Sequence, residues 1–212
     1  MDDRLSDLSV TGLIDRLATS DPIPGGGSAA AVAGAMGAAL VRMVVALTTG
    51  RPIAAEHEHE LAQIEAAARA AQETLLRLAD EDATAYDAVV RARRLPRDSD
   101  AEREARQEQV DRATREATRV PLRTAAAAAS VLALAERLAP YGNRNAISDV
   151  AVGALLAAAA IRGAALNVRI NVPYLPEDDP LRTDAEEALG PLLGDLEARE
   201  ETVRTRVEER MR

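Results

Sequence analysis

The sequence predicts an all-α protein, a bundle of long antiparallel helices around two buried helices rich in Ala and Gly. Apolar residues make up 47% of the chain, but aromatic residues make up only 1%, and Phe and Trp are absent. Sheet cores usually draw on aromatic and β-branched residues, so this composition favours helices. Residues 29–47 and 146–168 are almost unbroken runs of small apolar residues without a polar face. We therefore expect both helices to be buried on all sides, covered by the longer, charged helical stretches.

The N-terminal part predicts a short helix followed by a turn rich in Pro and Gly. After a loose segment over residues 1–8, apolar residues recur at helical spacing over residues 10–18 and predict a short amphipathic helix. The prolines of residues 21–27 discourage helix before them, and the three consecutive glycines leave room for a close neighbour. Ser28 is the expected N-cap of the first apolar helix, because its hydroxyl can accept from an unpaired N–H group of the first turn.

The rest of the chain predicts three more helices around the second apolar one. A long helix is expected over residues 53–94, and another over residues 101–139, which Pro121 should kink without ending it. Alternating residues 168–172 are expected to be an extended loop after the second apolar helix. Residues 184–211 predict one last charged amphipathic helix.

Composition also argues against several classes of function. A net charge of −9 makes nucleic acid a poor partner. The chain has no cysteine, and hence neither a disulfide nor a catalytic thiol, which fits the cytoplasm. Residues 29–47 are long enough to span a membrane, but Ala and Gly are weakly hydrophobic, Arg42 interrupts the run, and no Trp or Tyr flanks it. With no basic region of a signal peptide at the N-terminus, we expect one cytoplasmic domain over residues 1–212 that contacts no membrane.

The glycine triplet allows two interpretations. Its backbone N–H groups at a helix N-terminus could hold an anion or a polar heterocycle. Alternatively, the glycines only allow the helix to pack closely against a neighbour, and a triplet by itself favours this packing role. No strand precedes the glycines and their spacing is not G-x-G-x-x-G, so a dinucleotide fold is not indicated. The chain contains no Lys, which excludes a P-loop.

Two carboxylates are candidate catalytic residues. Asp149 lies at the start of the second apolar helix, where it either stabilises the first turn or stands at a pocket wall to handle protons. Asp82 and Tyr86 are four residues apart on an inward face of the long helix, where an acid needs either an Arg partner or a function. His57 and His59 point to different sides of a helix, so we expect a solvated surface there and no metal site.

Four segments carry a resemblance to a known family. They are PIPGGGSAAAVAGAMGAALVRMVVALTTG from residue 22, DEDATAYDAVVRARRLP from residue 80, VPLRTA from residue 120 and YGNRNAISDVAVGALLAAAAIRGAALNVRIN from residue 141. In order and spacing they resemble the cyclodeaminase/cyclohydrolase family, over about residues 10–207. The family includes the cyclodeaminase part of formimidoyltransferase-cyclodeaminase and stand-alone bacterial methenyltetrahydrofolate cyclohydrolases. The resemblance implies an all-α bundle, a homodimer, a tetrahydrofolate derivative as substrate, and no metal or other cofactor.

The resemblance also implies a chemistry and a set of site residues. In the cyclodeaminase reaction N10 of 5-formimidoyltetrahydrofolate displaces ammonia and forms the 5,10-methenyl cation. In the cyclohydrolase reaction water opens that cation to 10-formyltetrahydrofolate. Both reactions pass through a tetrahedral carbon and need proton transfer, for which Asp149 is our first candidate and Asp82 our second. The expected substrate-binding residues are Gly25, Gly26, Gly27 and Ser28 against the flat ring, Asn143, Asn145, Asn167 and Asn171 on the pterin, Tyr86 and Ser148 beside them, and Arg169 or Arg97 on the glutamate carboxylates.

Three functions stay open at this point. The cyclohydrolase is favoured because these 212 residues carry no transferase part; the alternative is the cyclodeaminase that releases ammonia. A third possibility is a folate-binding helical dimer without catalysis. Arg51 and Arg97 stand where Lys is common in the family, which rules out a deprotonated Lys as base, since Arg stays charged. Arg42 and Arg162 interrupt the apolar helices, and they are expected either to pair with acids across the dimer or to line the site.

Overall fold

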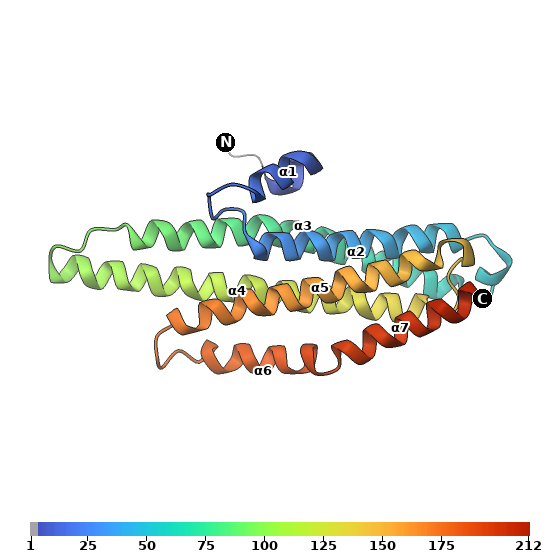
Figure 1. Cartoon of the computed structure of the whole chain (residues 1–212). Coiled ribbons are helices and arrows are strands. Elements are labelled where there is room, and N and C mark those ends of the chain that lie inside the picture. The colour runs from blue at the N-terminus through green and yellow to red at the C-terminus, as the bar shows by residue number, and fades with distance from the viewer. Residues whose placement is uncertain (1–3) are drawn as a thin grey trace.

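The computed structural model describes residues 4–212, and every regular element in this range is helical (Figure 1). The all-α prediction is therefore confirmed. Residues 1–8 were expected to be loose, but Leu5–Asp7 forms a short 3-10 turn, and residues 1–3 lie outside the described range. The helices are α1 (Val10–Leu17), α2 (Gly26–Thr48), α3 (Glu58–Arg93), α4 (Asp100–Leu138), α5 (Ile147–Asn171), α6 (Leu181–Gly194) and α7 (Leu196–Met211).

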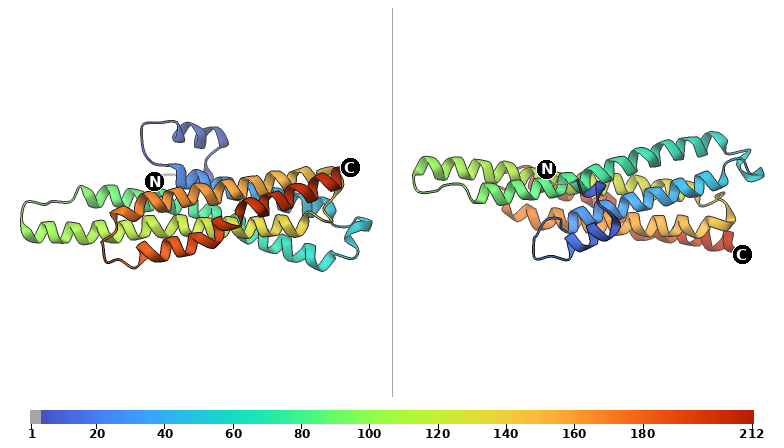
Figure 2. Two further views of the ribbon diagram at one scale, coloured as in Figure 1. Left: turned by 60° about the horizontal axis from the view of Figure 1, so that its bottom comes forward. Right: turned by 90° about the horizontal axis from the view of Figure 1, so that it is seen from above.

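Four long helices form the body of the bundle. The two apolar helices α2 and α5 pack against each other, and α3 and α4 pack against each other and against the apolar pair. Helices α6 and α7 pack against α5 and α4 on the side away from α3. Figure 1 and the left view of Figure 2 show α1 standing clear of the bundle, and none of its residues is buried.

Glycine brings the two apolar helices into close contact. A Cβ atom on Gly37 would lie 2.7 Å from the carbonyl oxygen of Gly153, and one on Gly153 would lie 3.1 Å from that of Gly37. The backbones of α2 and α5 therefore touch at this crossing, because neither residue has a side chain. Fully buried side chains of the other long helices, among them Leu61, Ile64, Leu75 and Leu132, share one hydrophobic core with residues of α2 and α5.

Several predicted boundaries are wrong. Helix α2 begins at Gly26 with Gly25 as N-cap, so Ser28 lies in the first turn and is not the cap. The long helix begins at Glu58, because Pro52–Ala54 forms a separate 3-10 turn first. Helix α4, by contrast, continues through Pro121 to Leu138 as expected, and Ser99 with Glu102 forms a capping box at its start.

Two predictions for the C-terminal part of the chain are also wrong. Residues 168–172 were expected to be an extended loop, but α5 continues to Asn171. Val168 is fully buried, so it extends the apolar face of the helix by another turn. The single helix expected over residues 184–211 is two helices that meet at Gly194 and Asp195. Pro191 and Gly194 weaken the helix just before this break.

The expectation that α2 and α5 are buried on all sides does not hold within a single chain. Both helices are long and apolar enough to cross a membrane by length and composition, and about half of each is buried inside the bundle. The other long helices, α3, α4, α6 and α7, pack on the other sides of the α2–α5 pair, and no helix in the described part of the chain covers the one side that remains. We define the α2–α5 face by its exposed apolar side chains: Met36, Met43 and Leu47 of α2, and Val152, Leu155, Leu166 and Ile170 of α5.

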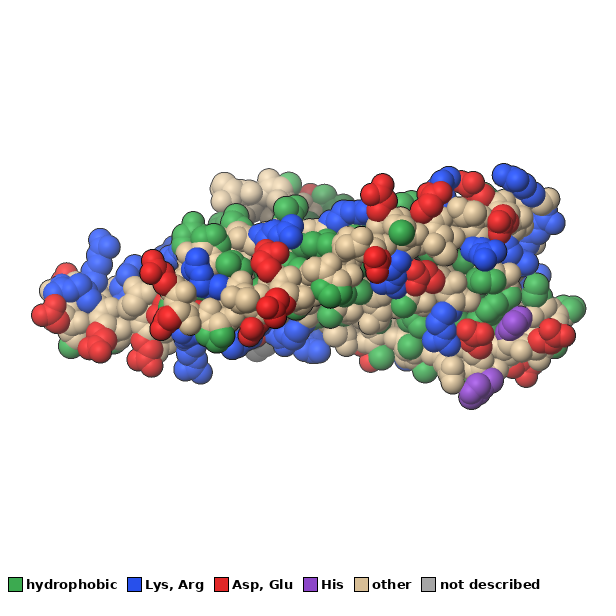
Figure 3. Space-filling model, turned by 90° about the horizontal axis from the view of Figure 1, so that it is seen from below, with side chains coloured by type: hydrophobic (Ala, Val, Ile, Leu, Met, Phe, Trp, Pro, Cys, Tyr) green, Lys and Arg blue, Asp and Glu red, His purple; other side chains and the backbone are tan. Residues whose placement is uncertain are grey.

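The arginines that interrupt the apolar helices pair within the chain. Arg42 donates to Glu65 at 3.0 and 3.1 Å and to Gln72 at 2.8 Å, both on α3. Arg162 pairs with Glu200 of α7. Neither arginine lines the pocket described below. Acidic and basic side chains are also interspersed over the underside of the bundle, as Figure 3 shows, in contrast to the apolar α2–α5 face.

Candidate functional site

A small pocket of about 190 Å³ lies where the first turn of α2 meets the middle of α3 and the last turns of α5. Two larger hollows, of about 770 and 900 Å³, lie elsewhere on the surface. Their charged side chains include two ion pairs, Arg42 with Glu65 and Arg123 with Glu81. The small pocket instead gathers residues that suit binding and proton transfer: Pro22, Ile23, Gly25, Gly26, Gly27, Asp82, Ala83, Tyr86, Ala117, Asn167, Ile170 and Asn171.

The Asp82 carboxyl group lies directly against the first turn of α2. The Ser28 Oγ atom is 2.9 Å from Asp82 Oδ2 and 3.0 Å from the carbonyl oxygen of Ala79. A Cβ atom on Gly27 would lie 2.2 Å from Asp82 Oδ1, a distance that no real contact shows. Gly27 is therefore required for the close approach of the carboxyl group to the helix N-terminus.

Two opposing effects act on the pKa of Asp82. Burial raises this pKa, because the surrounding protein solvates the charge less well than water does. Hydrogen bonds from the side chain and the backbone of Ser28 lower it and offset part of the burial effect. The net result is a pKa above the usual range of an aspartate. Such a carboxyl group is a stronger base than an ordinary aspartate, as proton transfer near neutral pH requires.

Ser28 can satisfy both protonation states of Asp82. When Asp82 is ionised, the single hydroxyl proton of Ser28 can point to the carboxylate. When Asp82 is protonated, it can donate to Ser28 Oγ, while the hydroxyl proton turns to the Ala79 carbonyl oxygen. Rotation of one hydroxyl group thus follows the arrival or departure of a proton at Asp82.

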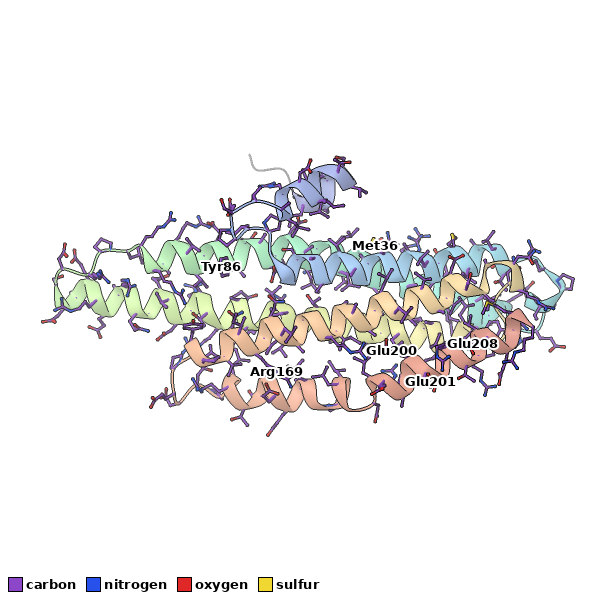
Figure 4. All side chains as sticks on the ribbon, viewed as in Figure 1. Met36, Tyr86, Arg169, Glu200, Glu201 and Glu208 are labelled. Carbon is purple, nitrogen blue, oxygen red and sulfur yellow. The ribbon has the colours of Figure 1, made fainter. Side chains whose placement is uncertain are left out.

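Amide groups of α5 form the opposite wall of the pocket. Asn167 Nδ2 donates to the carbonyl oxygen of Gly163 at 2.8 Å, and Asn171 Nδ2 donates to that of Ala117 at 2.8 Å. These bonds orient both amides and leave their side-chain oxygens as acceptors. Tyr86, 39% exposed and one turn beyond Asp82, stands at the rim (Figure 4).

The second group of expected site residues lies at the other end of α5. Asn143 is buried and structural: its backbone N–H donates to Thr48 Oγ1 at 2.9 Å and its Nδ2 donates to the Leu47 carbonyl oxygen at 2.8 Å. Asn145 and Ser148 are exposed, and Asp149 is half-buried in the first turn of α5. At about 1.5 Å per residue, Asp149 lies about 27 Å from Asn167 along the helix. Within one chain, the first-choice catalytic residue is therefore remote from the pocket.

The expected carboxylate-binding arginines lie outside the pocket lining. Arg169 pairs with Glu186 of α6 at 3.1 and 3.2 Å, and this hydrogen-bonded partner raises the pKa of Arg169. Arg97 is exposed in the loop between α3 and α4. Sequence reasoning did not consider Arg93, two turns beyond Tyr86 on α3, whose guanidinium lies 5.1 Å from the centre of the Tyr174 ring.

The two histidines lie far from the pocket lining. The ring of His57 stacks on Tyr141 with centroids 4.1 Å apart, and His59 lies 3.0 Å from the Gln63 side chain. Among residues 4–212, no group of three or more His, Asp or Glu side chains is arranged to hold a metal ion.

The apolar lining of the pocket was not anticipated. Ala83 lies between Asp82 and Tyr86 on α3, and Ile170 lies between Asn167 and Asn171 on α5. Helical spacing would have placed both beside the polar candidates. Pro22 and Ile23 belong to the turn that was recognised, whereas nothing in the sequence indicated that Ala117 of α4 would reach the site.

Comparison with known proteins identifies the family. A family model described as formiminotransferase-cyclodeaminase matches residues 9–189. The methenyltetrahydrofolate cyclohydrolase of Methylorubrum extorquens is 45% identical over 181 residues, which cover 85% of each chain. The formimidoyltransferase-cyclodeaminase of Mus musculus is 32% identical over 93% of this chain, but the match spans only 38% of the mouse protein.

A solved structure agrees with the sequence comparisons. The crystal structure of formiminotetrahydrofolate cyclodeaminase from Thermotoga maritima matches with a TM-score of 0.85 at 29% sequence identity. The match covers 97% of this chain and 98% of the other, so the whole bundle is shared. The chain belongs to the formiminotransferase-cyclodeaminase family.

Proposed function

We propose that the protein is a methenyltetrahydrofolate cyclohydrolase, which opens the 5,10-methenyl bridge to give 10-formyltetrahydrofolate. The 45% identity to the Methylorubrum extorquens enzyme of that name supports this reaction. The structural observation that carries the proposal is the Asp82 carboxyl group, which lies half-buried against the first turn of α2 and has a raised pKa. It is the acid of the pocket lining, and it lies beside amide acceptors and an apolar wall.

The pocket offers complementary contacts for a pterin ring. The glycines of the α2 turn line the pocket with bare backbone, against which a flat ring can lie. The side-chain oxygens of Asn167 and Asn171 accept hydrogen bonds from ring N–H groups. The methenyl bridge, which carries a positive charge, then lies beside Asp82. The rest of the substrate extends past Tyr86 towards Arg93, whose guanidinium pairs with a carboxylate of the glutamate tail.

Charge compensation couples binding to proton transfer. The cationic bridge favours the ionised form of Asp82 and so lowers its pKa when substrate binds. Water then attacks the bridge carbon and gives one proton to the Asp82 carboxylate, forming a neutral tetrahedral intermediate. Because the cation is lost in this step, the pKa of Asp82 rises again and the carboxyl group retains the proton. Collapse of the intermediate breaks the bond between this carbon and N5. The Asp82 carboxyl group gives its proton to N5 and returns to the carboxylate, and the hydroxyl proton of the intermediate is released to water as the carbonyl group forms.

The second candidate is the cyclodeaminase reaction, which the Thermotoga maritima structure favours by its TM-score of 0.85. The same pocket suits that chemistry. N10 attacks the amidine carbon and passes its proton to the amidine nitrogen, Asp82 in its protonated form gives this nitrogen a second proton, and ammonia departs. The methenyl cation that forms then faces the resulting carboxylate.

Absorbance of the methenyl bridge separates these functions. The protein is mixed with 5,10-methenyltetrahydrofolate, and separately with 5-formimidoyltetrahydrofolate. We expect the methenyl signal to disappear in the first mixture well above the uncatalysed rate, with formation of 10-formyltetrahydrofolate. Appearance of the signal together with ammonia in the second mixture alone would favour the cyclodeaminase. Binding of the folate at equilibrium without turnover in either mixture would contradict both reactions and leave a non-catalytic folate-binding protein.

We also propose that two copies associate through the α2–α5 face into a homodimer. The seven apolar side chains of this face are between 39% and 67% exposed. Their exposed parts add up to an apolar area on the order of 700 Å², close to the roughly 800 Å² that each partner buries in a standard-size interface. An isologous dimer would cover the face on both copies at once.

Cysteine cross-linking tests the dimer, because the chain has no cysteine of its own. Ala159 is exposed near the middle of α5, where a two-fold axis would pass. We expect Ala159→Cys to form a disulfide-linked dimer under mild oxidation, whereas the matched control Gly194→Cys at the end of α6 stays monomeric on a non-reducing gel. A monomer by sedimentation, or equal cross-linking of both variants, would contradict this dimer.

A further inference from the structure

We propose that each pocket is completed by Asp149 of the partner subunit. The proposal rests on the folate reaction and the dimer proposed above, and it adds a second acid to the site. It starts from a specific arrangement: the α2–α5 face carries the pocket at one end and Asp149 at the other.

Glycine contacts fix how the two helices run along this face. Gly26 lies against Asn167, with 3.5 Å between the position of its added Cβ atom and Asn167 Nδ2. At the other end, the backbone of Asn143 just before α5 binds Thr48 at the end of α2. The helices are therefore antiparallel, and the face runs from the pocket to the start of α5. Apolar residues are exposed beside both ends, Ile170 next to the pocket and Val152 next to Asp149.

Two-fold symmetry exchanges the ends of such a face. An axis perpendicular to it, near Met36 and Ala159, places residues 145–149 of one copy beside residues 167–171 of the other, because both segments are equally far from the middle turn of α5. A shallow crossing of about 20° keeps the two α5 helices in contact along their whole length, as in many helix bundles. The exposed apolar side chains extend along the full face, as such a shallow crossing requires.

Asp149 is suited to this role because its own chain leaves its carboxylate unused. It is half-buried in the first turn of α5, where the helix dipole stabilises a negative charge. Among residues 4–212 it forms no side-chain hydrogen bond or ion pair. Asp149 of the partner subunit would face the cationic methenyl bridge from the side opposite Asp82. Asp82 then takes the proton of the attacking water and passes it to N5, while the partner subunit's Asp149 stays ionised and stabilises the cation.

Subunit complementation tests the shared site directly. Two differently tagged chains, one with Asp82→Asn and one with Asp149→Asn, are co-expressed, and dimers that carry both tags are purified. Each variant alone should lose about 100-fold or more of the methenyl-opening activity. In a shared site the mixed dimer has one pocket with both carboxylates, so we expect about half of the wild-type activity per dimer. If both acids served the pocket of their own chain, the mixed dimer would be as inactive as its parents.

The reciprocal mixture gives the opposite result and serves as the control. Wild-type chains are paired with chains that carry both Asp82→Asn and Asp149→Asn. A shared site leaves one acid missing from each pocket, so these mixed dimers should be nearly inactive, whereas unshared sites would keep half of the activity. Full activity of Asp149→Asn homodimers would overturn the proposal while the folate reaction stands. Wild-type protein without turnover would instead overturn the proposed function.

Cross-linking gives a readout that does not depend on activity. In the double variant Ser148→Cys and Ile170→Cys, the two thiols of one chain are about 33 Å apart along α5, too far for a short bis-maleimide to join. We expect this reagent to produce covalent dimers of that variant, and none of a control with Ser148→Cys and Gly194→Cys. A monomeric protein that sediments with phosphatidylcholine vesicles would show that lipid covers the face, which would overturn the proposal.

Discussion

Ser28 in the first turn of α2 donates a hydrogen bond of 2.9 Å to Asp82 in the middle of α3. This bond joins the glycine turn to the acid of the pocket, two features 54 residues apart in the chain. It also explains why Ser28 does not cap α2, because its hydroxyl group is directed to α3 and Gly25 occupies the N-cap position. The turn thus holds the reactive carboxyl group in place, which makes its residues testable.

Removing the Ser28 hydroxyl group should shift the pH dependence of the reaction. The hydrogen bonds of Ser28 lower the pKa of Asp82, so Ser28→Ala should raise that pKa further. The rise of kcat/KM with pH, which follows the ionisation of Asp82, then moves to higher pH. At any fixed pH below the new pKa, turnover falls.

The control for this variant is Thr84→Ala on α3, the helix that carries Asp82, where the lost hydroxyl group bonds only the carbonyl oxygen of Asp80 at 2.9 Å. Its pH profile should match that of the wild type. A Ser28→Ala profile with unchanged position would show that Asp82 does not titrate in the reaction.

A side chain at Gly27 should displace the Asp82 carboxyl group. The Cβ atom of Gly27→Ala would lie 2.2 Å from Asp82 Oδ1, so the carboxyl group has to move by more than an ångström. A misplacement of this size costs about 100-fold in rate, measurable as loss of the methenyl signal. Gly194→Ala, where the new Cβ meets nothing within 4 Å, is the matched control and should keep full activity.

The contact of the two apolar helices should be equally sensitive to a single methyl group. Gly37→Ala places a Cβ atom 2.7 Å from the carbonyl oxygen of Gly153, so α2 and α5 must separate. We expect a loss of about 1–3 kcal/mol in the free energy of unfolding, the usual cost of overpacking. Denaturation by urea measures it, with Gly194→Ala again as control. An unchanged midpoint for Gly37→Ala would contradict the close packing of α2 and α5.

Stability should depend on pH through the buried acid. Because burial raises the pKa of Asp82 in the folded state above its unfolded value of about 3.9, ionisation at neutral pH disfavours the folded state. The stability that the protonated group allows is fully present below about pH 3.9 and is lost as the pH rises through the folded pKa. Asp82→Asn removes this charge, so its Tm should exceed that of the wild type at pH 7.5, with the difference shrinking towards pH 4. A lower Tm at pH 7.5 would contradict this electrostatic account.

The sequence alone could predict much of the fold because its patterns are local. The apolar runs over residues 29–47 and 146–168 became the cores of α2 and α5. The predictions that failed depend on contacts between residues far apart in the sequence. Ser28 was assigned as a cap because its partner Asp82 on α3 could not be foreseen from the turn.

The site was predictable residue by residue but not as an assembly. Asp82 with Tyr86, and Asn167 with Asn171, share helical faces, and the fold brings both pairs to the glycine turn. Asn145 and Asp149 lie in the same family-like segment as Asn167, yet the length of α5 keeps Asp149 about 27 Å away and Asn145 farther still. Sequence spacing does not distinguish a site within one chain from a site between two chains.

The most direct test of the central claim is the single-turnover rate at which Asp82→Asn opens 5,10-methenyltetrahydrofolate. Asn keeps the shape of the side chain and its hydrogen bond to Ser28, but it cannot accept the proton from water. We predict that the variant still binds the folate and keeps its helical circular dichroism, while the absorbance of the bridge decays about 10²- to 10⁴-fold more slowly than with the wild type. Decay at the wild-type rate would contradict the assignment of Asp82 as the proton acceptor.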